Sequence, residues 1–177
     1  MFSKVLSDSK YKAFVDGEIK EISLQDYKGK YVVVVFYPLD FTFVCPTEIN
    51  RLSDLKEEFL KRNAVVLLVS CDSVYTHKAW ASIPREKGGV LGVSWPMIWD
   101  AKRELCSQFS MFDEENGHPM RGTVLLSKDL SARHMSVNYP AIGRSVDEIL
   151  RLIDALAFNE ENGEICPVEW RKDVKNH

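Results

Sequence analysis

The chain has 177 residues, of which 45% are hydrophobic and 28% are charged. This length fits one domain of ordinary size, and the apolar content is sufficient for a folded core, so the composition excludes an intrinsically disordered protein. The 23 basic and 26 acidic residues leave a net charge of −3. This balance gives no electrostatic reason to expect a nucleic acid or an anionic membrane as a partner.

The apolar segments are short. The longest ones, 32–37 and 65–69, have the length of strands and fall well below the roughly 18 residues that a membrane-spanning helix requires. Residues 1–8 turn polar too soon to form the apolar centre of a secretory signal, which takes about 7 to 15 residues. We therefore expect a cytoplasmic protein with no membrane partner.

Two nearly continuous apolar segments rich in β-branched residues predict strands that are covered on both faces. They span residues 30–37, where Pro38 ends the run, and residues 64–70. Between them, apolar residues at spacings of three and four predict one face of a helix: Ile49, Leu52, Leu55 and Phe59. The first part of the chain is therefore predicted to be a strand, helix, strand unit.

The middle of the chain predicts further elements of both kinds. Residues 73–82 have a weak helical pattern, and Asp100 can cap a helix over residues 101–109. Residues 122–127 and 132–137 are separated by a short polar segment and predict an antiparallel hairpin. The sheet is therefore expected to be mixed.

The last predicted helix has the clearest start in the sequence. Ser145, with Glu148 three residues later, forms a capping box, and the apolar pattern that follows ends near Asn159. The remaining tail is polar and shows little periodicity. We predict one α/β domain over residues 1–160 and a surface arm over residues 161–177.

The four cysteines are Cys45, Cys71, Cys106 and Cys166. They form no C-x-x-C pair, so the sequence predicts no metal centre. An even number also allows two structural disulfides, although a chain of this size needs none and shows no secretory signal. Cys71, at the end of a strand, and Cys106, on a helical face, are interpreted as packing residues.

Cys45 has the most distinctive surroundings of the four. It follows a short aromatic loop and stands immediately before Pro46, a residue favoured at the first position of a helix. We therefore place Cys45 at the helix cap, where unpaired N–H groups and the positive end of the helix dipole stabilise a thiolate. Thr42, three residues earlier, offers a hydroxyl that can donate and accept hydrogen bonds.

The segment FYPLDFTFVCPTE, residues 36–48, resembles the active-site signature of the typical 2-Cys peroxiredoxins, and GEICPVEW, residues 163–170, resembles their resolving-cysteine motif. The similarity extends from about Val32 to Arg171 and includes THKAW, RGTVLL and GRSVDEILRLIDAL. The resemblance is specific, because two separate cysteine motifs occur in the order typical of the family.

This resemblance implies a thioredoxin-like α/β fold with a mixed central sheet flanked by helices. By motif position, Cys45 matches the peroxidatic cysteine and Cys166 the resolving cysteine. The other matching active-site residues are Pro38, Thr42 and Arg121, and the matching supporting pair is Glu48 and Arg144.

The implied activity is that of a thiol-dependent peroxidase acting on hydrogen peroxide and organic hydroperoxides, with no metal or other cofactor. A sulfenic acid on Cys45 is resolved by Cys166 of a partner subunit, and thioredoxin or a related dithiol reductant restores the thiols. The family forms homodimers, often assembled into decameric rings.

Two other functions are alternatives to a peroxidase. A thioredoxin-type disulfide reductase is disfavoured, because Cys45 lacks a second cysteine in C-x-x-C spacing. A ring-forming chaperone or redox sensor with little turnover remains the alternative.

The sequence departs from the peroxide-sensitive members of the family in two places. Residues 88–92 read GGVLG where those members have a contiguous Gly-Gly-Leu-Gly, and no Tyr-Phe pair follows Trp170. Both features normally slow unfolding of the active site. We therefore expect sulfinic acid on Cys45 to accumulate only at high peroxide concentration.

Overall fold

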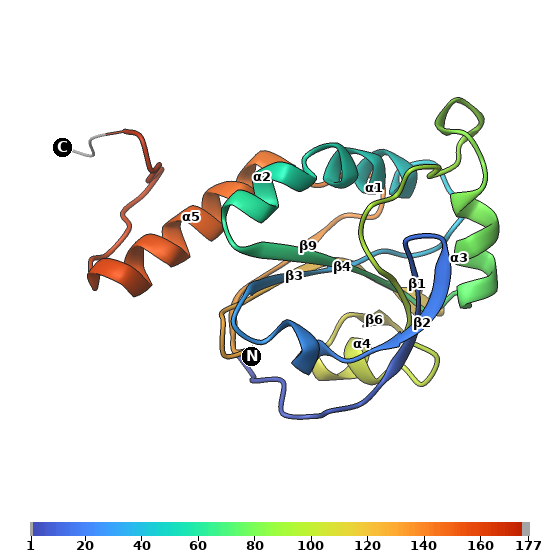
Figure 1. The fold of residues 1–177 in the computed structure, drawn as a ribbon, viewed down its shortest axis with the longest axis horizontal. Helices are drawn as coiled ribbons and strands as arrows, with labels where there is room; N and C mark the ends of the chain where they lie inside the picture. Colours follow the sequence, from blue (N-terminus) through green and yellow to red (C-terminus); the bar gives the residue numbers. More distant parts are fainter. Residues whose placement is uncertain (1, 175–177) are drawn as a thin grey trace.

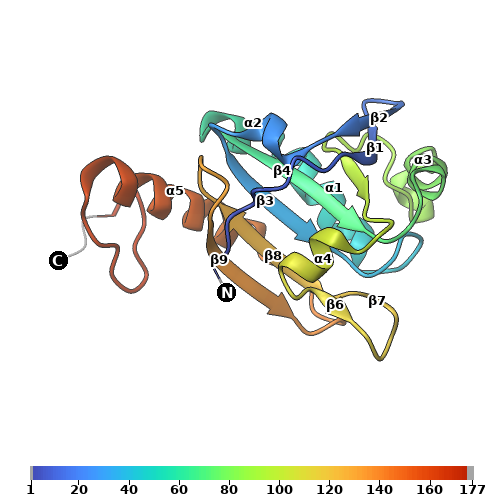
Figure 2. The ribbon, with the colours of Figure 1, turned by 90° about the horizontal axis from the view of Figure 1, so that it is seen from below.

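The computed structural model describes residues 2–174 and has a seven-stranded sheet at its centre, in the order β2-β1-β5-β4-β3-β8-β9 (Figures 1 and 2). The strands of this sheet are β1 (Tyr11–Val15), β2 (Glu18–Ile22), β3 (Tyr31–Phe36), β4 (Ala64–Ser70), β5 (Met97–Trp99), β8 (Arg121–Leu126) and β9 (Ala132–Asn138). A separate two-stranded ribbon pairs β6 (Phe112–Asp113) with β7 (His118–Pro119).

The helices are α1 (Cys45–Asp54), α2 (Lys56–Lys61), α3 (Val74–Ala81), α4 (Glu104–Gln108) and α5 (Val146–Asn162), with short 3₁₀ turns at Leu24–Tyr27 and Arg85–Lys87. In Figure 1, α1 and α2 lie above the sheet and α4 lies below it. Because β3 pairs in parallel with β4 and antiparallel with β8, the sheet is mixed. The predicted α/β fold, with a mixed central sheet flanked by helices, is confirmed.

The core is built on β3 and β4. Every residue of both strands is buried, as expected for β-branched and apolar strands with helices on both faces of the sheet. Parallel strands carry their carboxyl ends to the same edge of a sheet. The loops after Phe36 and after Ser70 therefore leave the sheet side by side.

The single helix predicted between these strands is divided in two. Leu55 leaves the helical conformation and separates α1 from α2. The predicted apolar face nevertheless continues from α1 into α2, because Ile49, Leu52 and Phe59 are all fully buried.

Two predicted helix boundaries were wrong. The helix after Asp100 begins at Glu104 and not at 101, because Arg103 adopts a positive φ of 57°. Asp100 still caps it, since its carboxylate accepts hydrogen bonds from the backbone N–H groups of Leu105 and Cys106. The last helix continues three residues past Asn159 and ends at Gly163 in the left-handed conformation.

The predicted hairpin at the far edge of the sheet is confirmed as β8 and β9. The hairpin of β1 and β2, by contrast, is absent from the elements predicted from the sequence. It turns at Asp16 and Gly17, both with positive φ, as two-residue hairpin loops require.

The chain after α5 runs back along the end of that helix (Figures 1 and 2). It is fixed by Trp170, which is buried against Phe158 with the ring centroids 5.0 Å apart. Arg151 Nη1 donates to the carbonyl of Trp170 at 3.0 Å. Residues 175–177 of the predicted arm lie outside the described residues. Within residues 2–174, no helix has the length and apolar character needed to cross a membrane.

Candidate active site

Cys45 lies where the loop after β3 enters α1. The helix begins one residue earlier than predicted, so that Val44 is the cap and Cys45 the first helical residue. The N–H groups of Thr47 and Glu48 close the first turn on the carbonyl of Val44. Cys45 is fully buried, and the positive end of the helix dipole acts on its sulfur.

Arg121 brings a cation to this sulfur from the start of β8. Its Nη1 lies 3.5 Å from Cys45 Sγ and 2.9 Å from Glu48 Oε2, and its Nε donates to the carbonyl of Pro140 at 3.0 Å. Because the guanidinium is planar and held at two further points, it cannot turn away from the sulfur. A fixed cation at this distance stabilises negative charge on Cys45.

Arg144 and Glu48 complete a buried network behind Arg121. Glu48 Oε2 accepts a second ion-pair contact from Arg144 Nη2 at 3.2 Å, and Oε1 accepts the Arg144 backbone N–H at 2.9 Å. The Arg144 guanidinium also donates to the carbonyls of Phe36 and Gly122. Burial lowers the pKa of Arg144, and the Glu48 carboxylate opposes that effect. Two guanidinium groups thus share one carboxylate, which leaves a net positive charge beside the sulfur.

The aromatic loop between β3 and α1 contains the other two predicted residues. Pro38 is buried two residues after the end of β3, and Thr42 is partly exposed. The Thr42 hydroxyl donates to the carbonyl of Leu39 at 2.8 Å, so its oxygen retains lone pairs for a further contact. Phe41, next to Thr42, has a positive φ of 60°, a strained conformation for an aromatic residue that the surrounding loop must enforce.

The loop between β3 and α1 is fixed by a buried cluster around Asp40, which no pattern in the sequence indicates. Asp40 accepts a hydrogen bond from the Tyr37 hydroxyl at 2.7 Å and lies 2.6 Å from His77 Nδ1. Its own N–H donates to Asp72 at 2.9 Å. Burial and the Asp40 carboxylate raise the pKa of Tyr37 far above its usual value, so its hydroxyl remains a donor. A lone carboxyl group in a loop carries no periodic signal, and no spacing in the sequence links it to His77, which lies 37 positions away.

Cys166 is the one predicted site residue that is not close to the others. Its Sγ donates to the carbonyl of Ala155 at 3.3 Å, and Ala155 lies nine residues beyond Val146, or about 14 Å along the helix axis. The start of α5 is the part that lies beside α1, because Gly143 approaches Val44 and Glu48. The two predicted redox cysteines of one chain are therefore separated. Burial raises the pKa of the Cys166 thiol.

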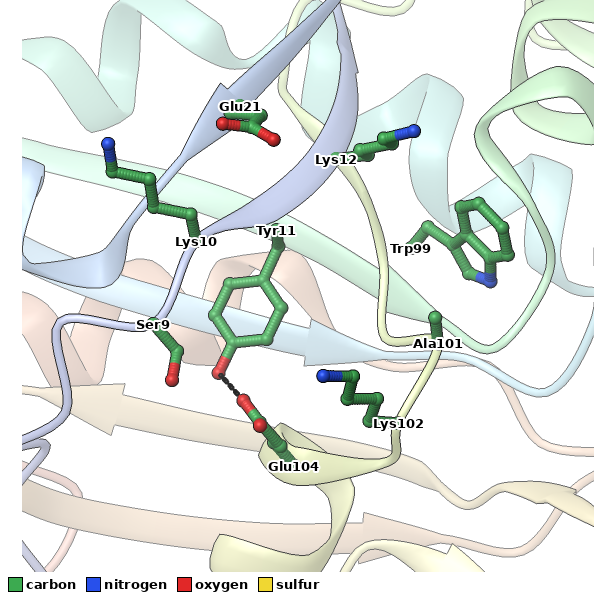
Figure 3. Close-up of a pocket in the computed structure, with 9 residues that line it drawn as sticks. All are labelled: Ser9, Lys10, Tyr11, Lys12, Glu21, Trp99, Ala101, Lys102 and Glu104. Atoms are coloured by element: carbon green, nitrogen blue, oxygen red, sulfur yellow. Dashed lines mark hydrogen bonds between the residues drawn. The ribbon is translucent and has the colours of Figure 1, made fainter.

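A hollow of about 510 Å³ lies on a different part of the surface, between β1 and the start of α4 (Figure 3). The Tyr11 hydroxyl points to Glu104 across it and donates at 3.2 Å. Its lining contains none of the predicted site residues. The hollow is therefore separate from the candidate active site around Cys45.

Comparison with known proteins identifies the family of this chain. Residues 5–135 match the model of the AhpC/TSA family. The chain is 78% identical over 177 residues to a protein of Encephalitozoon cuniculi named "Putative thioredoxin peroxidase", with 100% of both chains covered. It is 48% identical over 158 residues to Peroxiredoxin-2 of Bos taurus, covering 89% of this chain and 79% of that protein.

Solved structures show the same fold. The reduced 2-Cys peroxiredoxin of Plasmodium vivax superimposes with a TM-score of 0.90 at 39% identity, over 94% of this chain and 86% of that one. AhpC of Enterococcus faecalis gives a TM-score of 0.86 at 34% identity, over 94% and 98% of the two chains. The chain therefore belongs to the AhpC/TSA family and is a 2-Cys peroxiredoxin with the expected thioredoxin-like fold.

Proposed function

We propose that this thiol-dependent peroxidase reduces hydroperoxides by attack of the Cys45 thiolate. The observation that carries the assignment is the contact of 3.5 Å between Arg121 Nη1 and Cys45 Sγ, made by a guanidinium that is also fixed on Glu48 and Pro140. A buried thiol with a fixed cation and a helix start beside it is arranged to react as an anion.

The charge movement of the reaction explains why the cation is needed. The sulfur attacks one peroxide oxygen in line with the O–O bond, and the other oxygen leaves as hydroxide or alkoxide. Negative charge therefore moves from the sulfur to the leaving oxygen. Arg121 has several donors in one plane, so it can contact both ends of this axis, and donors that are already in position lower the barrier most.

The loop residues have complementary roles in this proposal. The Thr42 oxygen, whose own proton is engaged by the Leu39 carbonyl, accepts a hydrogen bond from the peroxide and aligns it with the sulfur. Pro38 keeps water away without adding a competing donor. Glu48 and Arg144 act as positioning residues that hold Arg121.

Cys166 of a partner subunit is the proposed resolving residue. The separation along α5 argues against resolution within one chain, and Cys166 lies in a segment with the exposed apolar residues Ile165 and Val168. β9 is the edge strand of the sheet, and the exposed Tyr139 and Ile142 follow it closely. An apolar sheet edge suits pairing with a second copy, which supports a homodimer.

Further partners follow from the family. Two similar proteins, from Encephalitozoon cuniculi and Fasciola hepatica, are named "Putative thioredoxin peroxidase" and "Thioredoxin peroxidase". We therefore propose thioredoxin or a related dithiol as the reductant of this chain.

A decameric ring of dimers is the proposed assembly. Residues 1–160 are the proposed peroxidase domain and residues 161–177 the arm. The cytoplasmic location expected from the sequence stays a prediction.

The decisive test is consumption of hydrogen peroxide with thioredoxin, thioredoxin reductase and a nicotinamide reductant, compared between wild type and Cys45→Ser. Wild type should turn over many times and Cys45→Ser not at all. Turnover by the Cys45→Ser variant would overturn the assignment of the nucleophile. Stoichiometric oxidation without turnover in wild type would favour the chaperone or sensor alternative.

A further inference from the structure

Cys71 and Cys106, which the peroxidase mechanism does not use, are brought together by the sheet. Cys71 directly follows β4, and the neighbouring strand β5 ends one residue before Asp100. The Asp100 N–H donates to the carbonyl of Ser70 at 2.9 Å, which fixes the two strand ends against each other. Asp100 then caps α4, and that helix carries Cys106 back over the end of β4.

The two sulfur atoms and an Asp100 carboxylate oxygen all lie within 4.8 Å of one another. Both thiols are free, Cys106 is fully buried and Cys71 is partly exposed. A disulfide needs an S–S distance of about 2.05 Å, so the two sulfur atoms must move closer together for one to form.

The two thiols differ in chemical character. The neighbouring Cys106 side chain lowers the pKa of Cys71, although burial acts in the opposite direction. The same contact, together with burial, raises the pKa of Cys106. Cys71 is also the more exposed of the two thiols, so a peroxide can reach it first, and the buried Cys106 is placed to act as the resolving thiol.

A metal ion is the competing occupant of this cluster. Both Asp100 oxygens are already used by the N–H groups of Leu105 and Cys106, at 3.3 and 2.9 Å. Even with Asp100 included, the cluster offers three ligands among the described residues, whereas a closed zinc site takes four. The cluster is therefore better suited to redox chemistry than to holding zinc.

We propose that Cys71 and Cys106 form a second redox-active dithiol, which closes to an intramolecular disulfide when the protein meets hydroperoxide. The Cys71 thiolate forms an S–O bond as the O–O bond breaks, and the leaving oxygen takes a proton to become water or alcohol. Cys106 sulfur then attacks the Cys71 sulfenic acid, and the sulfenic oxygen leaves as water. The two thiols lose two electrons and two protons in total, and the peroxide gains them.

The test uses the full chain with Cys45→Ser and Cys166→Ser combined, which leaves only the two proposed thiols. After treatment with hydrogen peroxide, intact mass should fall by two hydrogen atoms, both cysteines should resist alkylation in denaturant, and dithiothreitol should reverse both changes. Peptide mapping should give a Cys71–Cys106 linkage. With Cys106→Ser added, Cys71 should instead stop at the sulfenic acid, which dimedone traps.

Two results with this double variant would overturn the proposal. One is oxidation of Cys71 to higher acids while Cys106 stays alkylatable. The other is stoichiometric zinc retention by the reduced variant, detected by native mass spectrometry, with both thiols protected by the metal. If the double variant does not fold, as judged by circular dichroism, peptide mapping of oxidised wild type decides the matter. A Cys71–Cys106 peptide beside the Cys45–Cys166 one supports the proposal, and its absence refutes it.

Discussion

At the scale of single residues, Arg121 provides the positive charge beside the Cys45 sulfur. Arg121→Ala removes the only guanidinium recorded within hydrogen-bond distance of Cys45 Sγ among the described residues, so we expect the rate constant of the peroxide step to fall about 10²-fold to 10³-fold. Rapid mixing with hydrogen peroxide measures it. Arg121→Lys keeps the charge but cannot hold Cys45, Glu48 and Pro140 together, and its rate should lie in between. Equal rates for wild type and Arg121→Ala would contradict the proposed role.

Glu48 is the residue on which two buried cations depend. In Glu48→Gln the Arg121 and Arg144 guanidinium groups lose their shared carboxylate, and breaking a buried ion pair costs roughly 3–5 kcal/mol. We expect the free energy of unfolding in urea to fall by about that amount. The control is Glu57→Gln on the exposed side of α2, which should change it by less than about 0.5 kcal/mol. Similar losses in both variants would show that Glu48 is not the centre of this network.

At the scale of elements, the β8–β9 turn contains a pH-dependent contribution to stability. The Asp129 carboxylate accepts hydrogen bonds from the Ser127 hydroxyl and from the N–H and hydroxyl of Ser131. These bonds hold the pKa of Asp129 well below its usual range. A carboxyl whose pKa is lower in the folded state stabilises the fold above its unfolded pKa of about 3.9, and this stabilisation is lost as pH falls below that value.

Asp129→Asn should therefore unfold at a lower temperature than wild type at neutral pH, and the difference should shrink as pH is lowered below about 4. Thermal unfolding followed by circular dichroism across that range measures it. Asp8→Asn, at an exposed position, is the matched control and should not show this trend. A difference in melting temperature that stays constant with pH would mean that charge on Asp129 does not matter.

At the scale of the whole molecule, the separation of Cys166 from Cys45 underlies the proposal that a second subunit supplies the resolving thiol. Mild oxidation should give a disulfide-linked dimer on a non-reducing gel, and Cys166→Ser should run as a monomer there while still reacting once with peroxide. Cys71→Ser and Cys106→Ser should leave the dimer band intact. A Cys45–Cys71 linkage in peptide mapping would instead indicate resolution within one chain.

The features that the sequence determined by itself are those with a local signal. Continuous apolar runs predicted β3 and β4, since strands covered on both faces have no polar side. The Ser145 cap marked the start of α5, and Pro46 after Cys45 marked a helix start to within one residue. The β1–β2 hairpin has a turn signal in Asp16 and Gly17 but no clear strand signal, because β2 is charged at three of its five positions and lacks the continuous apolar run of β3 and β4.

The tertiary structure alone decided which distant side chains meet. Asp40 and His77 are 37 positions apart, and no spacing in the sequence links them. Cys71 and Cys106 were interpreted separately as packing residues, yet the parallel pairing of β4 with β5 and the cap at Asp100 place their sulfurs together. Periodicity and capping are properties of neighbours along the chain, whereas these contacts depend on strand order and on the path that each crossover takes through space.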